Sequence, residues 1–287
     1  MKLEKIKKVV VIGSGTMGTG IAQMMAMAGY MTTLYDIDES KLKAAIVSIS
    51  KNIDGGIKRG KIHPEDKNHI LDKIEITNDF IALNGDLIIE AIVENLDVKI
   101  DLFKRLSSLC YTDAIFASNT SSIPITKIAA EITNPGRVVG MHFFNPAHIM
   151  KLVEIISGAA TDPEVAQTVF ELAEKLGKTA VMAKDAPGFI VNRVARNFYV
   201  ESLNVLEENV ADLETIDALM ENNGFRMGPF RLMDLIGIDT NHSVTKSMYE
   251  SFFYTPKFRP SRIQQQKVDA KHWGRKTGKG FYDYPEK

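Results

Sequence analysis

The sequence contains a single cysteine, Cys110, among its 287 residues, so no intrachain disulfide is possible. A cysteine-poor chain favours a reducing compartment, and we expect a cytoplasmic protein. Neither sign of charge dominates, because 35 basic residues stand against 36 acidic ones and the formal net charge is −1. A strongly basic surface for nucleic acid is therefore not expected.

Long apolar runs are also missing. The first residues, MKLEKIKKVVVIGSG, place lysines before an apolar core, but that core extends only from Val9 to Ile12. A signal peptide has an apolar core of about 7–15 residues, so we do not expect one here. No apolar stretch approaches the roughly 20 residues that cross a bilayer, and we expect no membrane partner.

The composition that is present is typical of a folded globular protein, with 45% hydrophobic and 25% charged residues. At about 100–200 residues per domain, the length predicts two domains. Over residues 1–185, short β-branched runs alternate with helical patterns, which predicts β-α-β units and a mostly parallel sheet. The expected strands are 9–12, 32–36, 86–93, 114–118, 137–143, 152–156 and 179–183.

Residues 186–287 contain helical patterns without strand partners, so we expect an all-α second domain that begins near Pro187–Gly188. Two helices expected in the first domain have an apolar face. The stretch KLKAAIVSISKNI contributes Leu42, Ala45, Ile46, Ile49 and Ile53, and DVKIDLFKRLSSL contributes Val98, Leu102, Phe103 and Leu106.

A glycine pattern G-x-G-x-x-G, formed by Gly13, Gly15 and Gly18, lies between the first expected strand and a helix. Its glycines permit a tight turn, the approach of a pyrophosphate and close helix–strand packing, and the helix N-terminus attracts phosphate. The next strand ends at Asp36, where an acid accepts hydrogen bonds from the adenosine ribose and repels a 2′-phosphate. The pattern predicts a Rossmann-like, NAD-binding domain. A glycine turn without a ligand is the alternative.

Two histidines and one carboxylate lie in the apolar stretch RVVGMHFFNPAHIMKLVEIISG, residues 137–158. His142 ends an expected strand, where ligands collect in open α/β sheets. Glu154 lies in an apolar strand, where a carboxylate needs a partner. Spacing alone nominates this pair, while a satisfied core histidine is the alternative for both His142 and His148.

Taken in order, the motifs resemble those of the short-chain L-3-hydroxyacyl-CoA dehydrogenases, with the bacterial 3-hydroxybutyryl-CoA dehydrogenases as the closest group. The resemblance extends over nearly the whole chain. It is carried by GSGTMGTGIAQ (13–23), DLIIEAIVEN (86–95), ASNTSSIPIT (117–126), MHFFNP (141–146), KLVEII (151–156), PGFIVNR (187–193), MGPFRLMDLIGID (227–239) and GRKTGKGFYDY (274–284).

The resemblance implies a reversible, NAD-dependent oxidation of (3S)-3-hydroxyacyl-CoA to 3-oxoacyl-CoA, with the C4 pair 3-hydroxybutyryl-CoA and acetoacetyl-CoA expected. It implies a helical domain that mediates homodimer formation, and no metal. His142 matches the family's catalytic general acid/base, and Glu154 matches its partner. His148 falls where relatives carry an apolar residue or proline, and we expect it to be non-catalytic.

Other site residues are also assigned by resemblance. Ser121 and Asn192 match positions that hydrogen-bond the substrate, although a helix cap and a helix-start polar residue are the plainer interpretations. The cofactor-contacting positions are Thr16, Met17, Glu94, Lys99 and Asn119, together with the glycines and Asp36. A solvated ion pair is the alternative for Lys99.

Basic residues Lys51, Lys58 and Arg59 match the region that binds CoA phosphates, although solvated surface is the alternative. The chain departs from the family pattern at Gly55–Gly56 and at Gln264–Gln266. Two other functions stay in consideration. One is a dehydrogenase of a free hydroxy acid such as a sugar acid, and the other is a non-catalytic nucleotide-binding protein.

Overall fold

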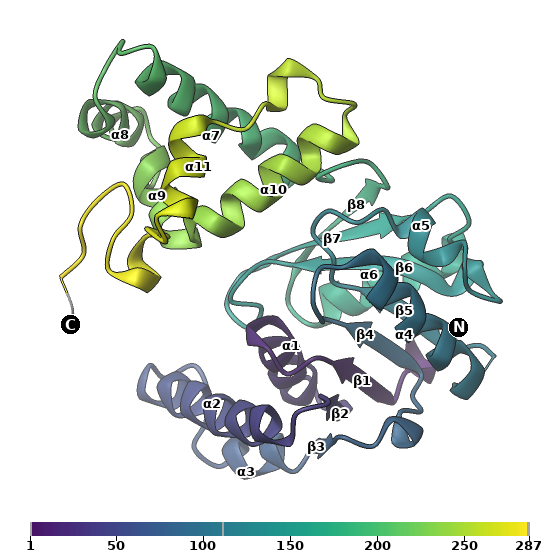
Figure 1. The fold of residues 1–287 in the computed structure, drawn as a ribbon. Coiled ribbons are helices and arrows are strands. Elements are labelled where there is room, and N and C mark those ends of the chain that lie inside the picture. Colours follow the sequence, from purple (N-terminus) through teal and green to yellow (C-terminus); the bar gives the residue numbers. More distant parts are fainter. Residues whose placement is uncertain (1, 111, 286–287) are drawn as a thin grey trace. The chain divides into compact units, whose positions relative to one another are not determined.

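The computed structural model describes residues 2–110 and 112–285. The chain divides into two compact units, Met1–Ala186 and Pro187–Lys287. The first unit is built on an eight-stranded sheet with the order β3-β2-β1-β4-β5-β6-β7-β8 (Figure 1). Its strands are β1 (Lys8–Ile12), β2 (Met31–Tyr35), β3 (Ile74–Thr77), β4 (Leu87–Glu90), β5 (Ile115–Ser118), β6 (Val138–Phe143), β7 (Leu152–Ser157) and β8 (Thr179–Lys184).

All neighbouring strands run parallel except β6 and β7, which are antiparallel. The first six strands have the 3-2-1-4-5-6 order of dinucleotide-binding sheets, and the order reverses between β1 and β4. The predicted mostly parallel α/β sheet is confirmed. Strand β3 was not among the expected strands, because its short sequence IEIT is half-exposed at the sheet edge and carries little apolar signal.

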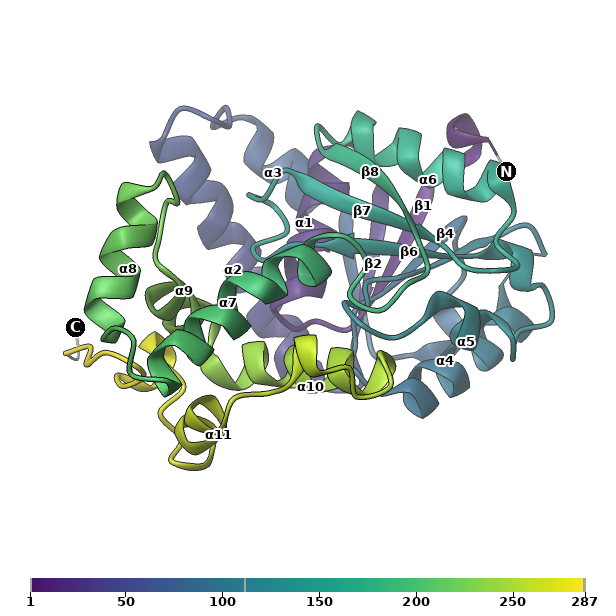
Figure 2. The ribbon, with the colours of Figure 1, turned by 90° about the horizontal axis from the view of Figure 1, so that it is seen from above.

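Helices cover both faces of this sheet. They are α1 (Thr16–Met27), α2 (Glu39–Lys58), α3 (Asp66–Leu71), α4 (Leu96–Leu109), α5 (Ile125–Ala129) and α6 (Pro163–Lys175), with 3₁₀ turns at Leu3–Lys5, Phe80–Ala82 and Pro135–Arg137. Apolar residues of α1 and α6 pack with the strands in one buried cluster. In Figure 2, α6 lies on one side of the strands and α4 and α5 lie on the other. The central strands β1, β4, β5 and β6 are therefore buried on both faces, as their continuous apolar sequences require.

Helix α4 differs from its prediction at one position. The apolar pattern predicts Val98 on the buried face, but Val98 is 45% exposed, while Leu102, Phe103 and Leu106 are buried as predicted. The inward position near the start of the helix belongs to Lys99, which is 1% exposed. The prediction was wrong because an ion pair, described below, holds this lysine inside.

The second unit is helical throughout its described residues, with only isolated β-bridges near its end. Its helices are α7 (Val191–Glu207), α8 (Leu213–Asn222), α9 (Pro229–Ile236), α10 (Ile238–Ser251) and α11 (Arg262–Asp269), with 3₁₀ turns at Pro256–Phe258 and Arg275–Thr277. The predicted all-α character is confirmed. Across both units, no described helix has the length and apolar character needed to cross a membrane.

Two buried aspartates hold the C-terminal segment of the second unit. Asp217 accepts hydrogen bonds from two backbone N–H groups at the start of α9 and from the Tyr282 hydroxyl. Asp234 accepts hydrogen bonds from two backbone N–H groups of the C-terminal segment and from the Tyr284 hydroxyl. Burial and the Asp234 carboxylate raise the pKa of Tyr284 to about 12. These contacts give a structural reason for the MGPFRLMD and GKGFYDY stretches.

Candidate functional site

The glycine loop and the start of α1 form the first part of the site. Gly13 has φ +99°, and a Cβ there would lie 2.6 Å from the Ala91 carbonyl oxygen. A Cβ on Gly18 would lie 1.7 Å from the Gly13 carbonyl oxygen, so only glycine lets α1 pack this closely on the loop. No atom lies within 4 Å of a Cβ placed on Gly15. Thr16, the first residue of α1, is exposed. The first N–H groups of a helix have no partner within the helix, so the N-terminus of α1 fits a diphosphate.

Asp36 follows β2 and already binds the glycine loop. The backbone N–H and the hydroxyl of Ser14 both donate to Asp36 Oδ2 at 2.8 Å. Burial raises the pKa of Asp36, but the hydrogen bonds from Ser14 outweigh it, so the pKa lies below its usual range. The carboxylate is therefore ionised at neutral pH and has acceptor capacity left for a ribose, which fits NAD.

A buried ion cluster lies beside this loop. Glu90 ends β4 with 0% exposure and accepts hydrogen bonds from Lys99 Nζ, the Ser118 hydroxyl and the Ile92 N–H. Lys99 Nζ is also 3.3 Å from Glu94 Oε2. The solvated ion pair considered for Lys99 is therefore wrong, because its side chain is 1% exposed. Glu90 was missed, although a carboxylate in the apolar run DLIIEAIV is the same signal that identified Glu154.

Glu94 organises the loop that follows β5. Its Oε1 accepts hydrogen bonds from the Thr120 hydroxyl at 2.6 Å and from the Ser121 N–H at 3.0 Å. Burial raises the pKa of Glu94, but the Lys99 charge and these hydrogen bonds hold it below its usual range. Asn119 lies in the same loop, and its Oδ1 accepts a hydrogen bond from the Phe143 N–H at 2.9 Å. Asn119, Ser121 and Glu94 therefore lie together at the carboxyl edge of the sheet.

His142 and Glu154 lie directly opposite each other on the antiparallel strands β6 and β7. Nδ1 of His142 is 2.7 Å from Oε2 of Glu154, and the two side chains are 7% and 0% exposed. The pair that the sequence nominates therefore lies within hydrogen-bond distance. A buried carboxylate that bonds Nδ1 fixes the ring tautomer and leaves proton exchange to Nε2.

The loop after β6 brings two more polar residues to this edge. Asn145, which precedes a cis peptide bond to Pro146, and His148 line a cavity of about 450 Å³ with the start of α1 and the inner face of α2. Asn145 was not assigned a role from the sequence, although it belongs to the quoted MHFFNP motif. Burial, with the charges of Lys178 and Arg59, lowers the pKa of His148. His148 Nδ1 has no hydrogen-bond partner within the described ranges.

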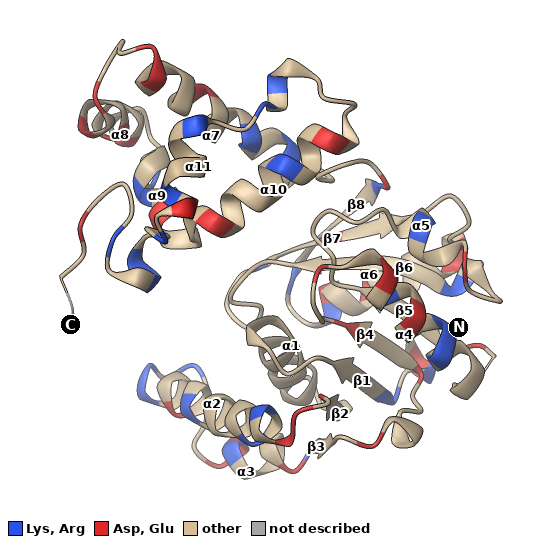
Figure 3. Cartoon of the chain, in the orientation of Figure 1, with Lys and Arg blue, Asp and Glu red and all other residues tan. Residues whose placement is uncertain are grey.

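The basic residues predicted for CoA lie on and after the last turns of α2. Lys51, Lys58 and Arg59 are exposed, and Figure 3 shows Lys and Arg on this helix and on the turn that follows it. The helix continues through Gly55 and Gly56. A Cβ on Gly56 would meet Ile62 at 2.6 Å, so this glycine allows the following turn to fold back on α2.

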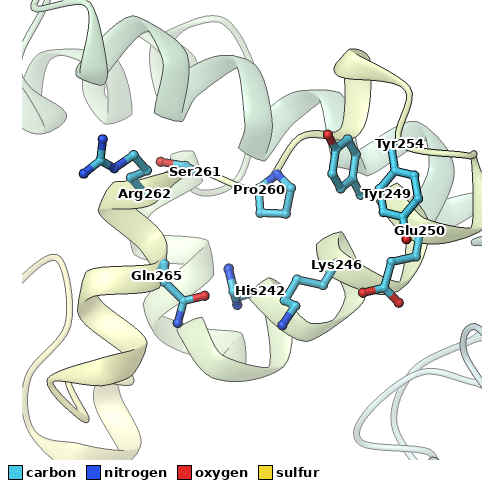
Figure 4. Close-up of a pocket in the computed structure, with 9 residues that line it drawn as sticks. All are labelled: His242, Lys246, Tyr249, Glu250, Tyr254, Pro260, Ser261, Arg262 and Gln265. Carbon is cyan, nitrogen blue, oxygen red and sulfur yellow. The ribbon is translucent and has the colours of Figure 1, made fainter.

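Asn192 lies in the first turn of α7, in the second unit. That unit also has a cavity of about 370 Å³ between α10 and α11. Figure 4 shows His242 and Lys246 from α10 and Gln265 from α11 around it. None of the site residues predicted from the sequence lines this cavity.

Comparisons with known proteins cover nearly the whole chain. The family model of the NAD-binding domain of 3-hydroxyacyl-CoA dehydrogenases matches residues 8–186, and the model of their C-terminal domain matches residues 188–284. A 3-hydroxyadipyl-CoA dehydrogenase of Escherichia coli (strain K12) is 47% identical over 97% of this chain and 59% of its own length. A probable 3-hydroxybutyryl-CoA dehydrogenase of Bacillus subtilis (strain 168) is 42% identical over 99% of both chains.

Solved structures give the same result. The structure of a 3-hydroxybutyryl-CoA dehydrogenase from Escherichia coli K12 is similar with a TM-score of 0.95 and 46% identity, covering 99% of this chain and 61% of that chain. An (S)-3-hydroxybutyryl-CoA dehydrogenase from Ralstonia eutropha gives a TM-score of 0.94 and 38% identity, covering 98% and 100%. The chain therefore spans about three fifths of the length of the Escherichia coli matches and nearly the full length of the Bacillus and Ralstonia proteins.

Proposed function

The chain belongs to the 3-hydroxyacyl-CoA dehydrogenase family, and we propose that it catalyses the reversible, NAD-dependent oxidation of (3S)-3-hydroxyacyl-CoA to 3-oxoacyl-CoA. The observation that carries the proposal is the buried hydrogen bond between His142 and Glu154 at the carboxyl edge of a dinucleotide-type sheet. Relatives named for 3-hydroxybutyryl-CoA support a C4 substrate.

The proposed mechanism assigns the proton to His142. The nicotinamide, when bound, supplies or accepts the hydride. His142 Nε2 takes the proton of the 3-hydroxyl during oxidation and returns it during reduction, because Nδ1 is held by Glu154. Glu154 keeps the ring in one orientation and stabilises the imidazolium that forms.

The remaining polar residues position the ligands in this proposal. Ser121 and Asn192 hydrogen-bond the 3-oxygen and the thioester carbonyl, which orients the reacting carbon. The glycine loop, Thr16 and Met17 hold the diphosphate at the start of α1, and Asn119 contacts the cofactor. Lys99 acts on the cofactor site through Glu94, because its ammonium is bonded inside the protein.

We also propose that Lys51, Lys58 and Arg59 neutralise the phosphates of CoA. Their exposure on one end of α2 supports this role, since none of them has an ion-pair partner among the described residues. From its family we further propose that the chain forms a homodimer through its second unit and that it is cytoplasmic.

We predict that Asp36→Ser relaxes cofactor choice. Loss of the carboxylate removes the repulsion of a 2′-phosphate, so the kcat/KM for NADPH relative to that for NADH should rise roughly 10- to 100-fold. The measurement is steady-state reduction of acetoacetyl-CoA with each cofactor. Asp38→Ser is the matched control, because Asp38 caps α2 and serine keeps a capping oxygen. If Asp36→Ser left the ratio of kcat/KM for NADPH to that for NADH unchanged, Asp36 would not contact the cofactor.

The proposed function is tested by a kinetic profile with NADH across 3-oxoacyl-CoA substrates from C4 to C10. We expect turnover with the CoA thioesters and the highest kcat/KM at the short end. The Escherichia coli relative at 47% identity is named for a substrate whose acyl chain ends in a carboxylate, so the profile includes a dicarboxylic chain. Absence of turnover with every thioester would contradict the proposal.

A further inference from the structure

The cavity between α10 and α11 lies entirely within the second unit. Its volume of about 370 Å³ is in the range of about 300–1,000 Å³ that is typical of small-molecule sites. Figure 4 shows polar side chains at one end, His242, Lys246 and Gln265, and two aromatic rings at the other, Tyr249 and Tyr254. Neither the proposed cofactor site nor the proposed CoA site uses these residues, so the proposed reaction does not explain the cavity.

A buried histidine lines the polar end of this cavity. His242 is only 4% exposed, and its Nε2 has no hydrogen-bond partner in the described part of the chain. Burial lowers the pKa of His242, and the nearby charge of Lys246 lowers it further, while Asp269 acts in the opposite direction. The ring is therefore uncharged at neutral pH. A buried polar atom without a partner is costly, so a ligand that hydrogen-bonds this imidazole would be favoured.

Two side chains of opposite charge on α10 border the cavity without neutralising each other. Lys246 and Glu250 are exposed and four residues apart, but neither forms an ion pair with any residue that the structure describes. In Figure 4 the Lys246 ammonium lies on the His242 side, and the Glu250 carboxylate lies on the side of the tyrosines. A ligand in the cavity therefore meets a cation at one end and an anion at the other.

The aromatic end is formed by a turn with an uncommon backbone conformation. The rings of Tyr249 and Tyr254 pack edge to face, with their centroids 5.3 Å apart. Phe253 and Tyr254 have φ angles of +52° and +61°, which residues other than glycine rarely adopt. The Tyr254 N–H closes the turn by donating to the Tyr249 carbonyl oxygen at 2.8 Å. Tyr254 stays 64% exposed, so its ring is open to stacking by a planar ligand.

We propose that this cavity binds a nucleoside monophosphate whose base carries an exocyclic amino group, such as an adenine nucleotide. The phosphate bonds the His242 ring and the Lys246 ammonium. The base stacks on Tyr254, and its amino group donates to the Glu250 carboxylate. A planar ring with an anionic group at one end and an N–H donor at the other matches all three features of the cavity, whereas an acyl chain or an inorganic anion matches only one. The site goes beyond the proposed function and does not depend on it.

Three probes separate the expected contacts. AMP carries both the phosphate and the amino group, adenosine lacks the phosphate, and IMP has a carbonyl oxygen in place of the amino group. Calorimetric titration uses the full chain saturated with NADH, so that the proposed cofactor site is filled. AMP should bind at least about 10-fold more tightly than adenosine or IMP, because each of these lacks one charge-assisted hydrogen bond. Equal affinities for the three probes, or no binding of AMP, would overturn the inference.

Substitutions of exposed residues locate the site without disturbing the core. Lys246→Met should weaken AMP binding about 10-fold or more and leave adenosine binding unchanged. Glu250→Gln should abolish the difference between AMP and IMP, because an amide can bond either base. Lys257→Met is the matched control, since Lys257 is an exposed lysine of the same unit that does not line the cavity, and it should bind AMP like the wild type.

The basic end of α2 is the competing location for a nucleotide. AMP bound there would lose affinity in Lys58→Met and keep it in Lys246→Met, which would overturn the inference. The His242 ring gives a direct readout, because its NMR signals can be assigned by their loss in His242→Phe. They should shift when AMP is added to the wild type and stay in place in Lys246→Met. AMP binding without a shift of the His242 signals would contradict the proposed site.

Discussion

The variant His142→Gln should reduce acetoacetyl-CoA about 10²- to 10⁴-fold more slowly than the wild type, while its affinity for NADH stays nearly unchanged. Glutamine keeps a polar side chain that can hydrogen-bond to Glu154, but it cannot carry the proton at the position of Nε2. The buried contact of 2.7 Å between His142 and Glu154 supports this role. Turnover is measured by NADH absorbance, and cofactor affinity by NADH fluorescence.

The same substitution at His148 is the matched control. His148 lies on the loop after β6, and its Nδ1 has no partner in the described part of the chain. His148→Gln should keep most of the wild-type turnover, because no general acid or base is removed. If His142→Gln turned over at the wild-type rate, the proton would have to move through another group.

The second large effect concerns stability. Lys99→Met should lower the free energy of unfolding by about 3–5 kcal/mol, because it leaves the Glu90 carboxylate buried without its cation. Methionine keeps the length of the side chain and removes only the charge. The free energy is measured by urea unfolding followed by circular dichroism, and the first unit is the part that should unfold at lower urea concentration.

Two further variants show whether this effect comes from the buried charge. Lys104→Met removes a lysine of the neighbouring turn whose ion pair with Glu131 is about half exposed, so it should cost less than about 1 kcal/mol. The double variant Glu90→Gln and Lys99→Met removes both buried charges and should regain part of the lost stability. Equal effects of Lys99→Met and Lys104→Met would contradict a special role for the buried cluster.

Local patterns in the sequence predict much of this protein. Alternation of apolar strands and amphipathic helices predicts the α/β class, and the glycine loop with Asp36 predicts the dinucleotide-binding edge. These features depend on residues that are neighbours in the chain or on repeated local geometry. The structure adds two hydrogen bonds from Ser14 to the Asp36 carboxylate, which no sequence pattern predicts.

Other features depend on long-range pairing and could not be predicted in this way. The contact between His142 and Glu154 requires the one antiparallel pair of the described sheet and its register. The burial of Lys99, which the resemblance assigns to the cofactor site, could not be predicted either, because its partner Glu90 comes from a different element. Arg196 and its acceptors Asn241 and Thr245 are 45 and 49 residues apart, and nothing near Arg196 in the sequence points to them.

The central claim is that a CoA thioester, not a free acid, is reduced at the edge of the sheet that holds His142. Its most direct test is a side-by-side measurement of NADH oxidation with acetoacetyl-CoA and with free acetoacetate. We predict rapid turnover of the thioester and a kcat/KM at least about 100-fold lower for the free acid, because the binding energy of the CoA part is absent. Comparable or faster turnover of acetoacetate would indicate a free-acid dehydrogenase, and NADH binding without turnover of either would indicate a non-catalytic nucleotide-binding protein.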